Sequence, residues 1–319
     1  MRILLVKTSS LGDVVHQCPA VSDIARHYPA AHIDWVVEEA FADIARMHRD
    51  ISEVIPVALR RWRKTPLRSS VWREIRAFRR RMARERYDLV IDSQGLIKSA
   101  LIARLARGPR HGLDSTSARE PLASRFYDFV HRVPRELHPV ARNRLLAAAV
   151  LGGEPGSLID YGLSAGTVPA RDGPYVVLLS MTSRPEKLWP TERWTALARA
   201  LVGRGFRVIL PHGTPEERRR SEAIVAGSPD GEVPPHMQVP ELAALMKGAR
   251  AVIGLDTGLL HLAAGLGVPA VGIYGGTDPA RFGLYPGSDA AGRTRDVGSP
   301  AAMPATEEVL GAFGEVDCA

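Results

Sequence analysis

The stretch AVIGLDTGLLHLAAGLGVPAVGIYGGTD, residues 251–278, decides the fold. It contains two short apolar runs, Ala251–Leu255 and Ala270–Tyr274, on either side of a helical segment that opens at Gly258. Short apolar runs bounded by turn residues are typical of buried strands, and a strand–helix–strand unit makes its two strands parallel. The stretch therefore predicts one right-handed crossover of a parallel α/β sheet.

The same alternation continues along most of the chain, which predicts parallel sheets covered by helices. The other expected strands are Arg2–Val6, Asp34–Val37, Glu53–Val57, Leu89–Asp92, Tyr175–Leu179 and Arg207–Leu210. The helices expected between strands include Pro19–His27, Val71–Arg84, Ser99–Arg107, Glu192–Val202, Pro215–Ala226 and Pro240–Lys247.

The length and one composition break predict two domains. The chain has 319 residues, which is comfortable for two domains, and residues 152–174 are rich in Gly and Pro. We expect domains at residues 1–155 and 171–304, separated by this linker. A last helix, within residues 305–319, is expected to pack back on the first domain.

The basic charge is concentrated in one segment. The formal net charge is +7, but residues 60–86 hold twelve Lys and Arg against two Glu. Such a segment attracts a phosphate-bearing partner: nucleic acid, an anionic membrane surface or a phosphorylated substrate. The alternative is a solvated helix face without a partner. Two cysteines far apart in the sequence fit a reducing cytosol, and no apolar run is long and unbroken enough for a membrane span.

Reactive residue types gather where the expected strands end, which is where open parallel sheets bind ligands. The loop after the first strand reads KTSSLGD, residues 7–13, and Asp13 lies where a helix begins. Its carboxylate suits a general base that accepts a proton from an attacking hydroxyl. The alternative is a helix cap, a role that the same position favours.

In the second half, Lys187 and Asp256–His261 follow strands in the same way. The Lys187 ammonium suits a diphosphate, and the backbone amides of Thr257 and Gly258 open a helix toward an anion. His261 lies on the same helix face as Gly258. The alternatives are a surface lysine, a capping Asp256 and a buried histidine whose hydrogen bonds are satisfied.

Several enzyme classes are disfavoured. The chain has no GxxxxGK[ST] motif of a P-loop NTPase and no GxGxxG after its first strand. The histidines are scattered, and no HxxxH, CxxC or strand-end DxD occurs, so we expect no metal site.

Seven motifs in order along the chain resemble the lipopolysaccharide heptosyltransferase I family. They are VKTSSLGDVVH (6–16), VVEE (36–39), RRWRK (60–64), DSQGLIKSAL (92–101), REPLASRFY (119–127), DTGLLHL (256–262) and YGGTDP (274–279). The resemblance implies the GT-B fold, in which two Rossmann-like domains face a central cleft. It also implies inverting transfer of L-glycero-D-manno-heptose from ADP-heptose to the first Kdo of Kdo2-lipid A, with no cofactor and no essential metal.

The resemblance also assigns roles by position. Asp13 matches the general base and Lys187 a lysine that meets the donor phosphates. Glu217 matches a ribose contact and Met237 an adenine contact. The remaining matched donor-binding residues are Thr182, Ser183, Asp256, Thr257, Gly258 and His261. The acceptor-binding residues are Ser10, Gly12, Arg60, Arg61, Arg63, Lys64 and Arg119.

Because the implied acceptor is an anionic lipid, the basic segment becomes a candidate for binding it at the cytoplasmic face of the inner membrane, with Trp62 as an interfacial anchor. We expect a peripheral monomer that binds no nucleic acid. Two departures stand out: Ser183 replaces a second threonine, and Ser180–Met181 replaces an expected His-Ala pair.

Two rival functions remain. One is heptosyltransferase II or another ADP- or UDP-sugar transferase of the same fold, because the sequence specifies the acceptor only weakly. The other is a nucleic-acid-binding protein that uses residues 60–86, although no helix-turn-helix, zinc-finger or RNA-recognition signature is present.

Overall fold

The computed structural model describes residues 1–168 and 170–318, and divides the chain into two compact units, Met1–Gly162 and Leu163–Ala319. The break falls inside the Gly- and Pro-rich linker that the sequence predicts. Residues before the break still belong to the first unit, because the Arg144 guanidinium donates hydrogen bonds to the carbonyls of Gly156 and Leu158.

The first unit is built on a six-stranded, fully parallel sheet with strand order β3-β2-β1-β4-β5-β6. Its strands are β1 (Arg2–Val6), β2 (His32–Glu38), β3 (Glu53–Val57), β4 (Leu89–Asp92), β5 (Arg110–Leu113) and β6 (Phe129–His131). This order is that of a Rossmann sheet, and it reverses direction between the central strands β1 and β4.

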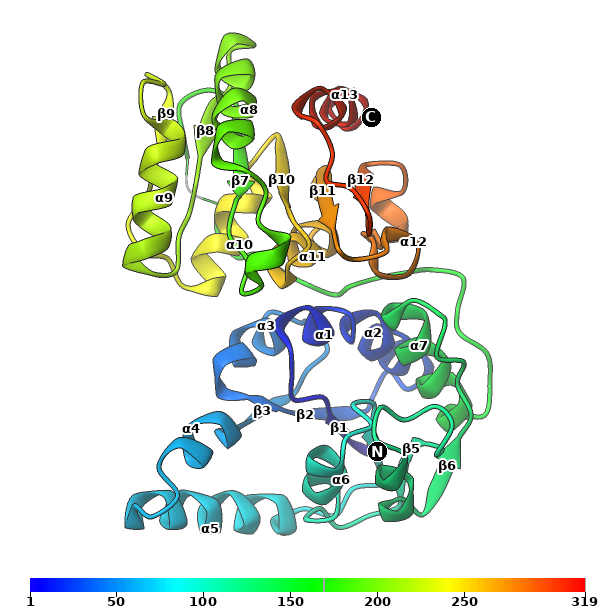
Figure 1. The fold of residues 1–319 in the computed structure, drawn as a ribbon. Helices are drawn as coiled ribbons and strands as arrows, with labels where there is room; N and C mark the ends of the chain where they lie inside the picture. The colour runs from blue at the N-terminus through cyan, green and yellow to red at the C-terminus, as the bar shows by residue number, and fades with distance from the viewer. Residues whose placement is uncertain (169, 319) are drawn as a thin grey trace. The chain divides into compact units, whose positions relative to one another are not determined.

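Helices cover both faces of this sheet, with α1, α2, α3 and α7 on one face and α5 and α6 on the other (Figure 1). The helices are α1 (Leu11–Val15), α2 (Cys18–His27), α3 (Ala42–Arg46), α4 (Leu59–Lys64), α5 (Ser69–Arg84), α6 (Ile97–Ala103) and α7 (Pro139–Leu151). The apolar positions of α5 that the sequence predicts to be buried, Val71, Phe78 and Met82, do pack inward, which leaves its arginines outside.

The second unit repeats this plan. Its parallel sheet has the order β12-β11-β10-β7-β8-β9, which is the Rossmann order counted from β7. The strands are β7 (Tyr175–Leu179), β8 (Arg207–Ile209), β9 (Gly231–Glu232), β10 (Ala251–Leu255), β11 (Ala270–Gly275) and β12 (Thr294–Ser299). The order of the strands along the chain changes direction between β7 and β10, while all six strands stay parallel. Both units therefore have the fold class that the sequence predicts.

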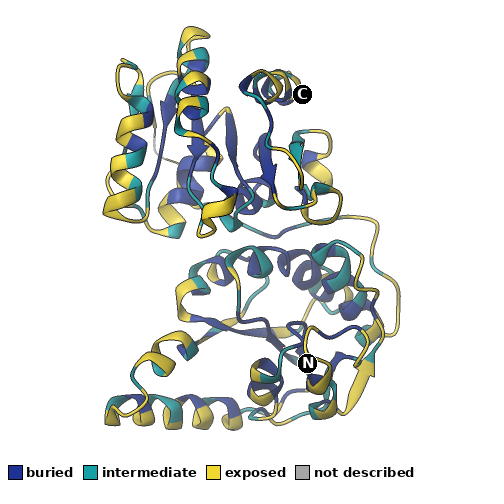
Figure 2. Ribbon diagram, viewed as in Figure 1, coloured by how far each residue is buried: buried dark blue, intermediate teal, exposed yellow. Residues whose placement is uncertain are grey.

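The helices of the second unit are α8 (Thr191–Gly203), α9 (Pro215–Val225), α10 (Val239–Lys247), α11 (Gly258–Gly265), α12 (Pro279–Phe282) and α13 (Thr306–Asp317). In both units the strands are largely buried and the outer helix faces exposed, as Figure 2 shows. Among residues 1–168 and 170–318, no helix has the length and apolarity that a membrane crossing requires.

The last helix, α13, differs from the expectation. It packs against β11, β12 and α8 of the second unit, and its Val309, Phe313 and Val316 are buried in that unit's core. The sequence predicts instead that this helix packs back on the first domain. The physical reason is that one face of the second sheet needs covering beside α8, and the apolar stripe of α13 supplies that cover.

Candidate active site

The two predicted site regions lie at the points where the strand order reverses. In the first unit, the loop after β1 and the loop after β4 meet there, and in the second unit the loops after β7 and β10 do. In open α/β sheets, this position beyond the carboxyl ends of the strands is where ligands bind. The topology therefore brings the KTSSLGD loop to the loop after β4 in the first unit, and Lys187 to Asp256 in the second.

Asp13 lies in the first turn of α1 and performs the capping role that the sequence left open. Its Oδ2 accepts a hydrogen bond of 2.8 Å from the backbone N–H of Ser10, the N-cap residue. Its Oδ1 accepts one of 2.8 Å from the guanidinium of Arg119, which is about half exposed. The structure thus places a predicted catalytic residue beside a predicted acceptor-binding residue far away in the sequence.

The charges around Asp13 keep its carboxylate ionised. Burial alone raises the pKa of Asp13, but the positive charges of Lys7 and Arg119 and the Ser10 N–H outweigh it, so the pKa lies below its ordinary value. A carboxylate in this state can accept a proton transiently, as a general base does.

Lys7 is a residue to which the sequence analysis gave no role. Its side chain is buried, and its ammonium donates hydrogen bonds to the Ser93 carbonyl at 3.0 Å and to Oδ1 of Asn143 at 3.4 Å. Burial lowers the pKa of Lys7 to about 8. A lysine placed directly after a buried strand was the available signal, because that position points into the switch point.

A buried polar network holds the loop that carries Ser9, Ser10 and Gly12. Oε1 of Gln94 accepts the backbone N–H groups of Thr8 at 3.1 Å and Ser9 at 3.2 Å. Asp92 in turn accepts the N–H of Gln94 at 2.8 Å and the hydroxyl of Tyr127 at 2.8 Å. The motif DSQG thus functions as a scaffold for the first loop.

Tyr127 reaches Asp92 because Gly112 on β5 leaves room for its ring. A Cβ atom at residue 112 would lie 2.3 Å from Cε2 of Tyr127, which is far inside van der Waals contact. Burial raises the pKa of Asp92, since its carboxylate is fully removed from water.

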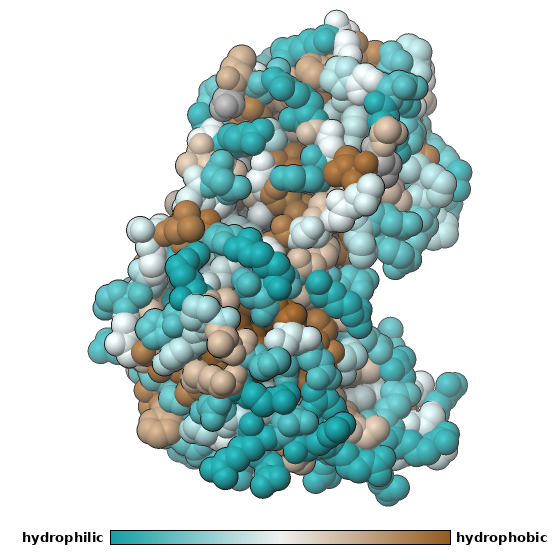
Figure 3. All heavy atoms as spheres, turned by 180° about the vertical axis from the view of Figure 1, so that it is seen from behind, coloured by the Kyte–Doolittle hydropathy of each residue, from teal (hydrophilic) through white to brown (hydrophobic). Residues whose placement is uncertain are grey.

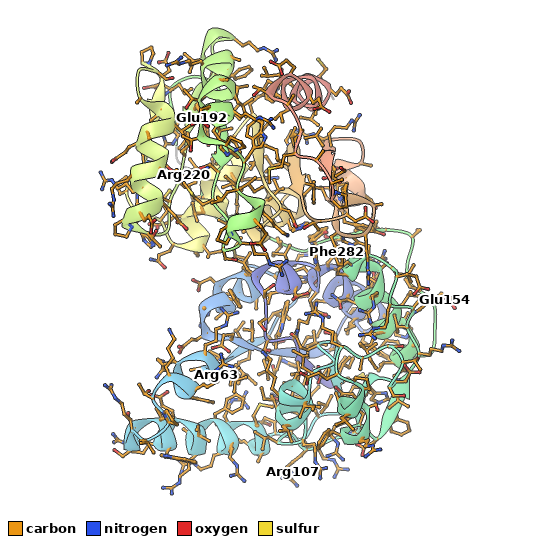
Figure 4. All side chains as sticks on the ribbon, viewed as in Figure 1. Arg63, Arg107, Glu154, Glu192, Arg220 and Phe282 are labelled. Carbon is orange, nitrogen blue, oxygen red and sulfur yellow. The ribbon has the colours of Figure 1, made fainter. Side chains whose placement is uncertain are left out.

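The basic helix α4 carries four predicted acceptor-binding residues in different settings. Arg61 is paired with Glu39 and Glu74, and Arg60 lies over the ring of Phe41 at 4.8 Å. Arg63 and Lys64 are exposed and form no ion pair within the described residues, and Arg63 extends from α4 in Figure 4. No hydrogen bond or ion pair within the described residues joins these four side chains to Asp13 or Arg119.

Trp62, expected as an interfacial anchor, packs inward. Its ring lies 5.9 Å from that of Phe78, and its indole N–H donates a 2.7 Å hydrogen bond to Glu74. Trp62 is half-buried because α4 places this side chain toward α5, beside the core, and the anchor role stays a prediction.

In the second unit, Asp256 joins the two other predicted charged residues. Its Oδ2 accepts a hydrogen bond of 2.6 Å from the Lys187 ammonium, and Nε2 of His261 lies 3.4 Å from its Oδ1. Burial raises the pKa of Asp256, but the hydrogen bonds and charges of His261 and Lys187 more than offset this and lower it to about 2. Asp256 is therefore ionised at neutral pH, and it orients a cation and an imidazole at one strand end.

Thr257 and Gly258 begin α11, as the sequence predicts. Thr257 is the N-cap residue with extended backbone angles, and the helix starts at Gly258. The first N–H groups of a helix have no partner within the helix and favour an anion. The loop of Lys187 is held in place from α9, where the Arg220 guanidinium (labelled in Figure 4) donates to the Trp189 carbonyl at 2.7 Å.

The remaining predicted donor-binding residues lie in loops and at a helix start. Thr182 accepts the N–H of Arg184 at 3.3 Å, Ser183 is exposed, and Met237 is half-buried before α10. Glu217 has a role that the sequence analysis missed. Its Oε2 accepts the N–H groups of Gly213 and Thr214, and Oγ1 of Thr214 accepts the N–H of Glu217, which together form a capping box for α9. The sequence TPEE was the available signal.

Across residues 1–168 and 170–318, no group of three or more metal-ligating side chains is found.

Comparison with known proteins decides the family. Residues 75–301 match glycosyltransferase family 9 (heptosyltransferase). The chain belongs to this family. Lipopolysaccharide heptosyltransferase 1 of Escherichia coli is 44% identical over 290 residues, which cover 89% of this chain and 91% of that protein. The enzyme of the same name from Pseudomonas aeruginosa is 46% identical over 292 residues, covering 89% and 81%.

Solved structures of a heptosyltransferase agree. The E. coli heptosyltransferase WaaC with ADP is 40% identical, covers 99% of this chain and 100% of that one, and gives a TM-score of 0.93. WaaC with ADP-2-deoxy-2-fluoro heptose gives a TM-score of 0.90. By contrast, lipopolysaccharide heptosyltransferase 2 of E. coli is 22% identical over 316 residues, covering 88% of this chain and 84% of that protein. The two Rossmann-like units are thus those of the GT-B fold, and this family 9 member is a glycosyltransferase.

Proposed function

We propose that this glycosyltransferase transfers L-glycero-D-manno-heptose from ADP-heptose to the first Kdo of Kdo2-lipid A, with inversion at the anomeric carbon. The observation that carries the proposal is the identity of 44% and 46% with lipopolysaccharide heptosyltransferase 1 of Escherichia coli and Pseudomonas aeruginosa over 89% of this chain. It is twice the 22% identity with lipopolysaccharide heptosyltransferase 2 of E. coli. Asp13, Lys187 and Asp256 with their partners supply the chemistry that such a transfer needs.

The donor binds at the second unit. The Lys187 ammonium and the N–H groups of Thr257 and Gly258 hold the diphosphate, with Thr182, Ser183 and His261 beside them. The Lys187 ammonium then donates hydrogen bonds to the phosphate oxygens as well as to Asp256. Glu217 contacts the ribose and Met237 the adenine.

The acceptor binds at the first unit. A Kdo carboxylate accepts hydrogen bonds from the guanidinium of Arg119, which also forms an ion pair with Asp13. Ser10 and Gly12 line the same loop, while Arg60, Arg61, Arg63 and Lys64 bind the anionic groups farther along the lipid. The exposed Arg63 and Lys64 support this assignment because no carboxylate of the described protein neutralises them.

Transfer is a single displacement. The oxygen of a Kdo hydroxyl attacks the anomeric carbon of the heptose, its proton passes to the Asp13 carboxylate, and the bond from that carbon to the diphosphate breaks. ADP leaves with the electron pair, and the cation and helix amides of the second unit stabilise its new charge. No cofactor takes part in this scheme, and no essential metal is required.

An amphiphilic acceptor places the protein at the cytoplasmic face of the inner membrane, as a peripheral monomer. The basic segment at residues 60–86 supports contact with an anionic membrane surface. Nucleic acid is not a partner in this proposal.

The test is incubation with ADP-heptose and purified Kdo2-lipid A, followed by mass spectrometry. We expect a product heavier by one heptose. A parallel incubation uses Kdo2-lipid A that already carries the first heptose. If only that acceptor is extended, the protein is a second-heptose enzyme, and if UDP-sugars replace ADP-heptose, the donor assignment is wrong.

A further inference from the structure

Two large apolar side chains are exposed to solvent at the turn that connects α4 to α5. Leu67 in this turn is 96% exposed, and Trp72 in the first turn of α5 is 54% exposed. We call these two residues the α4–α5 tip. Figure 1 shows the turn at the outer edge of the first unit, next to the N-terminal end of α5.

The α4–α5 tip is distinct from the buried face of its own helix. Val71, Phe78 and Met82 of α5 pack on the sheet, and Trp62 of α4 packs on Phe78. Leu67 and Trp72 are therefore not part of the core of the first unit. Hydrophilic side chains cover most of the face drawn in Figure 3, and hydrophobic ones form small groups. Leu67 is the most exposed large hydrophobic residue of the described chain.

The cations that follow the tip have no carboxylate partners. Arginines elsewhere are widely paired, as Arg144 is with Asp23 and Arg110 with Asp128. By contrast, the N-cap residue of α5 and four arginines within the helix are exposed and form no ion pair within the described residues: Arg68, Arg73, Arg76, Arg79 and Arg80. This face of α5 therefore has a positive charge that the protein does not neutralise.

The combination fits one occupant. Anionic headgroups attract a row of cations, and the boundary between headgroups and acyl chains takes up leucine and tryptophan side chains. A nucleic acid would also attract the cations, but its phosphates offer nothing to Leu67. Since a few apolar anchors or a basic patch alone bind membranes only weakly, the two together are needed for stable attachment.

We propose that the α4–α5 tip inserts into the headgroup–acyl boundary of an anionic bilayer while the arginines of α5 hold the lipid headgroups. The inference deepens the proposed function, because it names the segment that docks the enzyme on the membrane holding its acceptor. Binding to vesicles is measured in the absence of heptose transfer, so its outcome is independent of the heptosyltransferase activity.

The first test is co-sedimentation of the full chain with phosphatidylcholine vesicles, with and without phosphatidylglycerol. Wild type binds the anionic vesicles, and Leu67→Ser/Trp72→Ser weakens that binding roughly tenfold or more, because two apolar side chains no longer leave water. The matched control is Leu101→Ser/Leu122→Ser, which removes two exposed leucines elsewhere in the same unit and leaves binding unchanged.

Charge and insertion are separated by a second variant. Arg73→Gln/Arg76→Gln/Arg80→Gln also weakens binding, and the wild-type affinity falls with added salt because the headgroup attraction is screened. The double tip variant retains this salt dependence at its lower affinity. If the tip variant binds as wild type does while the arginine variant does not bind, attachment is purely electrostatic and insertion is overturned.

Trp72 also reports insertion directly. Trp35, Trp189 and Trp194 are fully buried and Trp62 is half-buried against Phe78, so Trp72 is the most exposed indole of the described residues. We expect a blue shift of fluorescence and quenching by brominated lipids, both lost in Trp72→Phe. Absence of quenching, or tighter binding to duplex DNA than to anionic vesicles, contradicts the proposal.

Measurements of heptose transfer distinguish an error in the membrane-docking inference from an error in the proposed heptosyltransferase function. With a Kdo acceptor freed of its acyl chains, the tip variant turns over at the wild-type rate, since neither residue belongs to the donor or acceptor site. With acceptor embedded in vesicles, the same variant is slower than wild type. If wild type transfers no heptose to either acceptor but still binds vesicles through the tip, the proposed function fails and the docking inference stands.

Discussion

Asp13 combines two roles that the sequence presented as alternatives. One carboxylate oxygen accepts the Ser10 N–H and so caps α1, while the other accepts Arg119. Capping orients the side chain. Oδ2 also accepts the Ser10 hydroxyl at 3.3 Å, so Oδ1, which accepts only Arg119, is the oxygen that retains a lone pair for a substrate hydroxyl. The local geometry is therefore compatible with a base that is fixed before the acceptor arrives.

Replacing Asp13 tests the base. We expect Asp13→Ala to lower kcat by about a hundredfold or more, because general base catalysis contributes on this scale. The affinity for ADP-heptose, measured by calorimetric titration, stays within a few-fold of wild type since the proposed donor contacts lie in the second unit. A kcat within a few-fold of wild type would reduce Asp13 to a helix cap.

Lys7 sets the pH range in which Asp13 can act. The charge of Lys7 is among the causes that lower the pKa of Asp13, so the ionised base persists to more acidic pH. Lys7→Gln keeps a hydrogen-bond donor but removes the charge. The pKa of Asp13 then rises, and the acidic limb of the kcat–pH profile moves to higher pH.

The matched control is Asn143→Ala, which removes a hydrogen-bond partner of Lys7 without removing its charge. This variant leaves the acidic limb where it is in wild type. An unshifted limb in Lys7→Gln, in protein that unfolds as wild type does, would show that Lys7 only supports the Ser93 carbonyl.

At the scale of elements, the start of α9 carries a capping box in which Glu217 has a second, proposed role at the ribose. Thr214→Ala removes only a cap and costs about 1 kcal/mol of unfolding free energy, with donor affinity unchanged. Glu217→Ala loses similar stability and also weakens ADP binding. Equal ADP affinity in the two variants, measured by titration beside urea unfolding, would limit Glu217 to capping.

The central strands could be predicted from the sequence because strands buried on both faces are apolar runs. Arg2–Val6, Tyr175–Leu179 and Ala251–Leu255 match the central strands β1, β7 and β10 residue for residue. The missed strands β5, β6, β9 and β12 are short or lie toward sheet edges, and their sequences mix polar and apolar residues. Nothing in a run such as Thr294–Ser299 distinguishes an edge strand from a loop.

Site residues near each other in the chain could be predicted, and contacts across the fold could not. The Asp256–His261 cluster lies within one strand–helix junction, so its spacing alone brought it together. Arg119 reached the list only through the family resemblance, because its ion pair with Asp13 spans 106 positions. The burial of Lys7 depends on Asn143 from α7, a helix that the sequence analysis did not expect.

At the scale of the whole molecule, each unit has its own sheet and core, so we expect two unfolding transitions in calorimetry. ADP at a hundred times its Kd raises the stability of the second unit alone, by about 2.7 kcal/mol. Phe313→Ala in α13 destabilises the same unit by about 3–5 kcal/mol.

These two effects must fall on one transition. If ADP and Phe313→Ala shift different transitions, the donor site is not in the unit that α13 completes. A single transition that shifts with both changes would show that the units unfold together.

Gly112 illustrates how a residue without a functional group determines where a reactive one lies. Because it has no side chain, there is space for the Tyr127 ring, whose hydroxyl donates a hydrogen bond to Asp92. Asp92 accepts the N–H of Gln94, and the Gln94 side chain accepts an N–H of the loop that leads to Asp13. A methyl group there would displace the ring and loosen every later link. A search limited to nucleophiles, acids and bases would overlook this position, yet a laboratory redesign of the enzyme should leave it untouched.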